Sequence, residues 1–398
     1  MKKWFYAIVG IVSMLLAGFV YAWSILSAPI AADFPQWSSA QLSLTFTVCM
    51  VFFCLGGITA GFLAKKIPAR FNITIAACLF ALGFFLTSRV RSLGLLYVSY
   101  GLLCGAASGL AYNAVMNIVP RWFPEQPGFI SGLLLMGFGA SSMVIGAAFT
   151  AMTQETTGAW RGSLLTIGLI MAAVLLAVSF VLDVPKGQTQ SGKKAASTAL
   201  AEYTPAQMLR HSGFWCLFVW AILLSAVGLI VISQARTLAL TASAALTPGT
   251  ISLVVGLISV CNGLGRVLFG ALFDRLGRKL TMLLVTAADL IAVALIALSL
   301  RGSFVCLVAG FVMLGFGYGG TPTFNAAVVK QFYGNENYAV NFSLMNTNLL
   351  VASFSSAIGA AMYDKAGNYS AVLILLFALA ALAFAVCFLV RQPKSEKE

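Results

Sequence analysis

The chain has 398 residues, of which 60% are hydrophobic and only 9% are charged, and its mean hydropathy is +0.96. A soluble globular domain carries about 25% charged residues, so this composition excludes that class of protein. The net charge of +13 would suggest nucleic acid as a partner in a soluble chain. Here almost all the basic residues fall in connections between apolar runs, and we expect no nucleic-acid partner.

Twelve stretches, taken in chain order, are long and apolar enough to cross a bilayer once each. They cover residues 5–27, 42–64, 72–88, 94–119, 128–151, 162–182, 213–232, 250–273, 280–300, 303–329, 341–362 and 369–390. Backbone N–H and C=O groups in hydrocarbon need internal hydrogen-bond partners, and segments of this length supply them only as α-helices. We therefore predict an all-α membrane protein with twelve transmembrane helices.

The distribution of basic residues along the connections predicts the orientation of the chain. With twelve spans, 17 of the 24 Lys and Arg residues lie on the side of the two termini and six lie on the opposite side. Because cytoplasmic loops carry the excess of Lys and Arg, both termini are predicted to be cytoplasmic. We expect a monomeric, multi-pass protein of the cell membrane, with the lipid bilayer as its surroundings and the bacterial plasma membrane as its location.

The longest polar stretch separates six spans from six spans. The predicted organisation is an N-terminal six-helix bundle, a cytoplasmic linker and a C-terminal six-helix bundle, at residues 1–183, 184–212 and 213–398. Internal symmetry supports this division. A shift of 210 residues places Tyr100–Pro124 over Gly310–Gly334, and a shift of 209 places Gly61–Phe71 over Gly270–Leu280. Two pseudo-symmetric bundles are the layout that such a repeat predicts.

Arg266 is a basic residue inside an apolar run. At about 1.5 Å per residue it lies roughly 12 Å inside the helix end at Asp274, near the centre of a hydrocarbon core about 30 Å thick. A permanent cation at that depth favours an anionic guest, and its planar fork matches a carboxylate. The alternative is an ion pair with Asp289, which is the clear acidic candidate on the next span.

A compact group of glycine, acidic and basic residues follows this span. It comprises Gly270, Asp274, Arg275, Gly277, Arg278 and Lys279. Asp274 sits just beyond a helix end, where it can meet helix N-terminal dipoles and arginines on the cytoplasmic face and so latch the outward-open state. The alternative is that the basic residues only set the orientation. In the equivalent loop of the first half, Lys65 stands where the acid would be, so any latch is asymmetric.

These residues also carry a family resemblance. The GxxxDRxGRK pattern that begins at Gly270 resembles the loop motif of the major facilitator superfamily. Four further stretches together resemble the oxalate/formate antiporter family, a relative of the monocarboxylate transporters: YAWS at 21–24, YGxxxGxxxGxxY at 100–112, RWFP at 121–124 and NGLGR at 262–266. The resemblance implies the major facilitator fold, alternating access and a substrate-binding arginine at Arg266.

Aromatic and amide side chains at the predicted span centres are the other candidates for the substrate cavity. They are Tyr21, Tyr112, Phe138, Tyr318, Asn113, Asn262 and Asn348. The first three match aromatic cavity positions of the resembled family. Each aromatic residue is equally compatible with helix packing, and each asparagine with an interhelical hydrogen bond.

The resemblance also bears on the substrate. Oxalate-type members have a lysine in the eleventh span, but Ser343–Gly359 contains no basic residue, and Asn346 or Asn348 stands there instead. One central cation balances one carboxylate, which favours monocarboxylates such as formate, lactate or pyruvate. A dicarboxylate exchanger and a multidrug or other solute carrier of the same superfamily are the alternatives.

The sequence gives less direct evidence on the driving force of transport than on the substrate. A proton or a counter-transported anion is the expected second partner. Asp289 is the candidate for proton coupling, and the sequence favours a structural role for it. The sequence has no nucleotide loop, no Cys-x-x-Cys pair and one histidine, with no nucleophile or acid pair at plausible spacing. We expect no enzymatic activity, no cofactor and no metal site.

Overall fold

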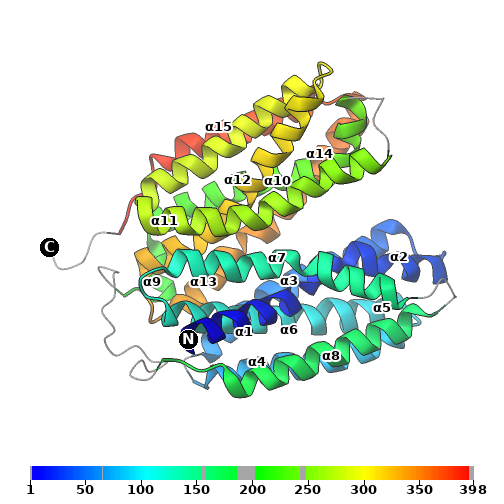
Figure 1. Ribbon diagram of the computed structural model, residues 1–398, viewed down its shortest axis with the longest axis vertical. Helices are drawn as coiled ribbons and strands as arrows, with labels where there is room; N and C mark the ends of the chain where they lie inside the picture. Colours follow the sequence, from blue (N-terminus) through cyan, green and yellow to red (C-terminus); the bar gives the residue numbers. More distant parts are fainter. Residues whose placement is uncertain (1, 65, 154–157, 186–201, 243–247, 394–398) are drawn as a thin grey trace. The chain divides into compact units, whose positions relative to one another are not determined.

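The computed structural model describes residues 2–64, 66–153, 158–185, 202–242 and 248–393, and Figure 1 shows that this part of the chain is built from helices. The prediction of an all-α protein is confirmed for these residues. Most of the predicted linker, residues 186–201, lies outside the described residues, and so does Lys65.

The first six predicted spans correspond to ten helical segments. They are α1 (Lys2–Ala17), η1 (Gly18–Ala22), α2 (Trp23–Asp33), α3 (Ser39–Leu63), α4 (Ala69–Ser88), α5 (Leu93–Leu96), the π-helical η2 (Tyr97–Cys104), α6 (Gly105–Ile118), α7 (Pro127–Met152) and α8 (Trp160–Val181), with a 3-10 turn η3 (Val119–Trp122) after α6. Figure 1 shows α4 and α8 running side by side.

The remaining helices follow the linker. They are α9 (Pro205–Arg210), α10 (Ser212–Ala242), α11 (Pro248–Ser299), α12 (Phe304–Tyr333), α13 (Tyr338–Asn346), α14 (Asn348–Ala366) and α15 (Ser370–Cys387). The span predicted at 213–232 was too short, because α10 continues to Ala242 and carries the exposed Arg236 on its last turns. A long basic side chain is tolerated near a helix end because it can reach the membrane surface.

Ten helices in the described part of the chain are long and apolar enough to cross a membrane. Two local features explain why ten helices correspond to twelve predicted spans. Two spans are merged in α11, where Gly277 interrupts the helical backbone at φ 74°, a left-handed value that glycine adopts without a Cβ clash. The eleventh span is divided at Thr347 into α13 and α14.

The chain forms two compact units that exchange short segments. The first consists of Met1–Pro124, Gly137–Ser197 and Asn335–Leu344, and the second of Glu125–Met136, Thr198–Gly334 and Met345–Glu398. The start of α7 therefore packs with the C-terminal helices, and most of α13 packs with the N-terminal helices. These units are defined by packing, and the predicted boundaries at residues 183 and 213 stay a prediction.

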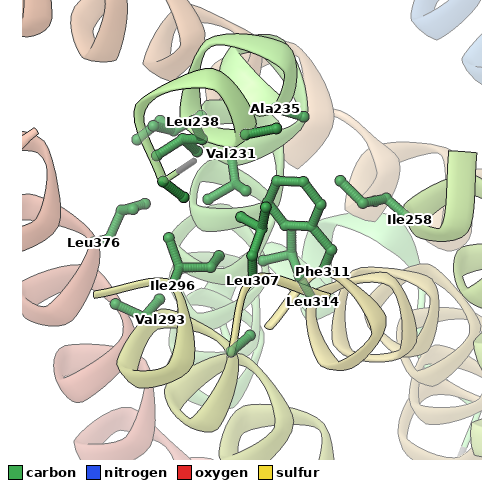
Figure 2. Packing of buried hydrophobic residues seen from close by; sticks show 14 of the residues in the cluster. Val231, Ala235, Leu238, Ile258, Val293, Ile296, Leu307, Phe311, Leu314 and Leu376 are labelled. Carbon is green, nitrogen blue, oxygen red and sulfur yellow. The ribbon is translucent and has the colours of Figure 1, made fainter. Parts of the chain in front are cut away.

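One large cluster in the core of the second unit consists of hydrophobic residues. Figure 2 shows Val231 and Leu238 of α10, Ile296 of α11, Phe311 of α12 and Leu376 of α15 packed together, and all five are nearly inaccessible. Inside a bilayer, lipid tails are as apolar as these side chains, so the cluster stabilises the unit through close van der Waals packing.

Glycines let the helices of each unit approach closely, as their small-xxx-small spacing predicts. A Cβ at Gly105 of α6 would come within 2.5 Å of the Cys49 carbonyl oxygen of α3, and one at Gly109 would overlap the Phe53 carbonyl. In the second unit, Gly315 and Gly319 of α12 meet the first part of α11 in the same way. These glycines therefore have a packing role.

Large apolar side chains also cover the outside of both units. Phe180 is 82% exposed, Val305 75% and Leu253 74%. Exposed apolar side chains in such number are unfavourable in water but suit helices whose outer faces meet lipid. This surface agrees with a multi-pass membrane protein.

Candidate substrate site and gate

Arg266 lies in the first part of α11 and is only 5% exposed. Its Nε donates to Asn262 Oδ1 at 3.2 Å, one turn earlier in the same helix. Its Nη1 donates to the backbone carbonyl of Leu135 in the part of α7 that belongs to the same unit. Both acceptors are neutral, so the positive charge is buried and oriented without being neutralised by any residue that the structure describes.

The helices α7 and α11 touch through their backbones beside this arginine. A Cβ at Gly132 would overlap the Arg266 carbonyl, and one at Gly128 would come within 2.6 Å of the Gly270 carbonyl oxygen. Gly128 and Gly132 are one turn apart on α7, as Arg266 and Gly270 are on α11. The absence of side chains at three of these positions permits the close crossing.

Asp274 continues this contact one turn further along α11. Its carboxylate accepts hydrogen bonds from the backbone N–H of Gly128 at 3.0 Å and of Phe129 at 2.8 Å. These N–H groups belong to the first turn of α7, where they have no acceptor within the helix and where the helix dipole favours a negative charge. The Lys330 ammonium also acts electrostatically on the carboxylate. A helix N-terminus is the kind of partner expected for Asp274, and its role as a latch stays a prediction.

The other members of the loop motif have separate roles in the structure. Gly270 forms the close crossing, and Gly277 supplies the backbone break. Arg278 donates to the Val390 carbonyl at 2.8 Å, and its guanidinium lies over the Phe332 ring. Arg275 and Lys279 are exposed.

Three of the predicted cavity aromatics form one cluster in the first unit. The Phe138 ring of α7 lies 5.4 Å from the Tyr21 ring of η1 and 4.9 Å from the Tyr112 ring of α6. Phe53 and Phe342, which were not among the predicted site residues, belong to the same cluster. The ring contacts are edge-to-face for Tyr21 and Tyr112 against Phe138 and stacked for Tyr112 against Phe342, and contacts of both kinds orient the rings and stabilise their packing.

Asn113 lies in the same unit and binds the start of the eleventh span. Its amide Nδ2 donates to the Ala339 carbonyl at 2.7 Å and to Ser343 Oγ at 2.5 Å, both in α13. Ser343 was not among the predicted site residues, although a hydroxyl inside an apolar span is a signal that could have identified it.

Asn262, Tyr318 and Asn348 lie with Arg266 in the second unit. Asn262 binds Arg266 as described, and the Tyr318 ring packs against Gly228 of α10. Asn348 is 1% exposed and donates to the Met345 carbonyl at 2.6 Å, beside the break between α13 and α14. The predicted site residues thus form two groups, one in each unit. That both groups line one substrate cavity stays a prediction.

Asp289 is not the partner of Arg266. Both of its carboxylate oxygens lack a hydrogen-bond partner among the described residues, and the side chain is fully buried next to Gly317 of α12. The ion pair that was the alternative for Arg266 is absent from the described structure.

Helices long and apolar enough to cross a membrane, with a buried arginine whose acceptors among the described residues are neutral, are typical of membrane transport proteins. The chain belongs to the Major Facilitator Superfamily, whose family model matches residues 6–238 and 221–398. Members of this superfamily are transporters and not enzymes. The protein is accordingly a multi-pass membrane transporter.

Relatives with related names match most of the chain. An oxalate:formate antiporter of Oxalobacter formigenes is 26% identical over 379 residues, which cover 94% of this chain and 88% of the antiporter. Monocarboxylate transporter 13 of Rattus norvegicus is 24% identical over 375 residues, which cover 90% of this chain and 82% of that protein. The resemblance to these two transporter families is confirmed.

Solved structures support the fold alone. The proton:xylose symporter XylE has a TM-score of 0.71 at 14% identity, covering 99% of this chain and 97% of its own. The transporter FucP in its outward conformation also has a TM-score of 0.71, at 18% identity, covering 99% of this chain and 100% of its own. The predicted major facilitator fold is confirmed.

Proposed function

We propose that this transporter carries small organic anions, most of all monocarboxylates such as formate, lactate or pyruvate, and that Arg266 binds the carboxylate. The observation that supports the proposal is the buried guanidinium whose two acceptors are both neutral oxygens. A charge held in this way at membrane depth is costly unless an anion joins it. The names of the two relatives above favour carboxylates as that anion.

The recognition of a carboxylate follows from the geometry of the guanidinium. The hydrogen bond to Asn262 holds Nε in place, and the bond to Leu135 holds Nη1. An incoming carboxylate replaces the Leu135 carbonyl and forms two parallel, charge-assisted hydrogen bonds with the fork. The exchange of a neutral acceptor for an anion is favourable because the buried charge is then neutralised.

A monocarboxylate is favoured over a dicarboxylate by charge. No basic residue occurs in α13 or in the part of α14 up to Gly359. A dianion bound to Arg266 would keep one uncompensated negative charge in a medium of low dielectric constant, which is unfavourable. The oxalate:formate relative makes a dicarboxylate exchanger the second candidate.

Transport is proposed to proceed by alternating access, with both termini in the cytoplasm and the bacterial plasma membrane as its location. In this cycle the contact of Asp274 with the start of α7 is the latch that forms in one state and breaks in the other. The chain is proposed to work as a monomer, with a proton or a second anion as the coupled partner.

The experiment compares carboxylate exchange by three forms of the protein in proteoliposomes. Arg266→Lys keeps the charge but loses the planar fork, and we expect its exchange of labelled formate or lactate to fall severely. Arg236→Lys is the matched control, because Arg236 is an exposed arginine on α10, and it should exchange like the wild type. Exchange by Arg266→Lys at the wild-type rate would refute the assignment.

A thermal-shift series with the purified wild type tests the substrate class. Stabilisation by monocarboxylates above that by oxalate supports the proposal. Stabilisation by oxalate alone supports the dicarboxylate exchanger instead. Protection by neither class, together with failure of exchange, would refute a carboxylate carrier.

A further inference from the structure

Asp289 is a fully buried acid that the proposed carboxylate site does not use. It is 0% exposed and lies ten residues beyond Lys279 in the second part of α11, which is about 15 Å along a helix and near the middle of a bilayer. Neither Oδ1 nor Oδ2 has a hydrogen-bond partner among the described residues. An acid in this position needs an explanation, because an isolated carboxylate is costly away from water.

The surroundings of Asp289 suit a proton and no larger cation. A metal ion or a sodium ion requires several oxygen ligands around it. Gly317 of α12 lies against the carboxylate and offers only its backbone CH₂ there, and no hydrogen-bonding group of the described residues reaches either carboxylate oxygen. A bound proton removes the charge and needs no further ligand, so the neutral acid is the form that this site accommodates.

The helices packed against α11 bring no counter-charge to Asp289. These helices are α7, which contains no titratable or charged residue, and α10, α12 and α15. On α12, the Tyr318 ring turns away to Gly228 of α10, while Cys306 and Lys330 lie toward opposite ends of the helix. On α15, Cys387 lies 3.3 Å from the hydroxyl of Thr286, one turn before Asp289.

The titratable and charged residues of α10 lie toward its two ends, as Cys216 near the start and the exposed Arg236 near the end. The Trp220 indole of that helix donates to the Thr286 hydroxyl at 2.9 Å. Arg266 follows Asn262 by one turn, and Asn262 faces Gly319 of α12, on the side of this helix opposite Gly317 and Asp289. Among the described residues, therefore, the neutralising partner of Asp289 has to be a proton.

The helix α12 separates Asp289 from the turn that holds Arg266. Gly315 and Gly319 of α12 face Cys261 and Asn262 in the first part of α11, whereas Gly317, which points the opposite way, faces Asp289. Further along the same helix, Pro322 cannot donate a hydrogen bond to the Tyr318 carbonyl, which weakens the helix at this point. A helix with glycines on two faces and an internal proline is suited to move between the two ionisable groups.

We propose that Asp289 is the proton-binding site that couples carboxylate transport to the proton gradient. This inference rests on the proposed carboxylate function. Asp289 takes up a proton from one side of the membrane while Arg266 takes up the carboxylate, and the two groups release them on the other side. One proton and one monocarboxylate move together, so the loaded transporter carries no net charge from its cargo.

The test uses Asp289→Asn, which imitates the protonated acid but cannot release a proton. In proteoliposomes that contain this variant, net uptake of labelled formate or lactate driven by an inward proton gradient should be lost. Exchange of labelled for unlabelled substrate at equal pH should be retained, because it needs no change in protonation. Asp183→Asn is the matched control, since Asp183 is exposed and its carboxylate accepts a bond from the adjacent Val184 N–H; it should keep both activities.

Loss of both activities in a folded Asp289→Asn protein, or retention of both, would overturn the proposal. If this variant does not fold, proton uptake by the purified wild type during substrate binding replaces it as the test. A proton taken up with each carboxylate at alkaline pH supports the proposal, and no proton movement at any pH overturns it. Uptake that requires sodium in place of the proton gradient also overturns the proton-coupling proposal. Wild-type protein that exchanges no carboxylate would instead refute the proposed carboxylate function.

Discussion

The contact between Asp274 and the start of α7 predicts how the substitution Asp274→Asn changes the transporter. The two hydrogen bonds of 3.0 and 2.8 Å to the Gly128 and Phe129 N–H groups are charge-assisted. Asparagine keeps the size of the side chain and one oxygen acceptor. It loses the charge, and its amide NH₂ cannot accept the second bond.

The magnitude follows from what is lost. A hydrogen bond to a charged group contributes about 1.5–3 kcal/mol, and the helix dipole adds about 0.3–1 kcal/mol for an acid at a helix N-terminus. Because the Asp274 side chain is only partly buried, we take a total near the lower end, about 2 kcal/mol. This difference changes the equilibrium between latched and unlatched states by about 30-fold.

The assay separates conformational switching from substrate binding. We expect exchange of labelled carboxylate by Asp274→Asn in proteoliposomes to be slower than that of the wild type, with a much smaller change in the equilibrium affinity for the substrate in detergent. Asp364→Asn serves as the control, because Asp364 is an exposed acid at the end of α14, and it should leave both quantities unchanged. An Asp274→Asn protein that exchanges at the wild-type rate would refute the latch.

Three further predictions concern packing and specificity. Gly132→Ala should lower the thermal unfolding temperature in detergent, because its methyl group overlaps the Arg266 carbonyl and overpacking costs about 1–3 kcal/mol. Gly256→Ala is the control and should not lower it, because a methyl group at this position of α11 meets open space. Equal changes in the two variants would contradict the close crossing. Asn113→Ala removes two hydrogen bonds to α13, each contributing about 0.6 kcal/mol in a membrane. It should therefore alter the exchange rate more than Ser343→Ala does. A larger effect of Ser343→Ala would argue against Asn113 as the main polar contact with α13. The wild type should gain more thermal stability from formate than from oxalate at equal concentration, and the reverse order would contradict the charge argument.

The sequence was sufficient to predict most of the membrane-spanning architecture. Lengths of apolar segments determine which parts of a chain can cross a bilayer, so the predicted spans agree with the observed helices over most of their length. The exceptions, where helices merge or divide, depend on backbone conformation, which hydropathy does not predict. Gly277 was placed correctly in a connection, but the merging of its two flanking helices and the break at Thr347 required backbone conformations.

The candidate site was only partly predictable. The depth of Arg266 in an apolar run was sufficient to single it out, because a buried arginine needs a partner. Its actual acceptor, the Leu135 carbonyl, could not be predicted, since every residue carries a backbone carbonyl and only tertiary packing selects one. The choice between a substrate and Asp289 as the partner of Arg266 likewise depended on contacts between helices that no sequence pattern specifies.

The crossing of α7 and α11 joins two interactions that lie about two turns apart on the same pair of helices. Arg266 holds α7 through the Leu135 carbonyl, and Asp274 holds it through the first backbone N–H groups. An anion that displaces the Leu135 carbonyl from Arg266, as proposed, therefore removes one of these two interactions. The hydrogen bonds of Asp274 to α7 are then the ones that remain. If the anion binds Arg266 as proposed, thermodynamic reciprocity requires that detachment of the first turn of α7 and binding of the anion favour each other.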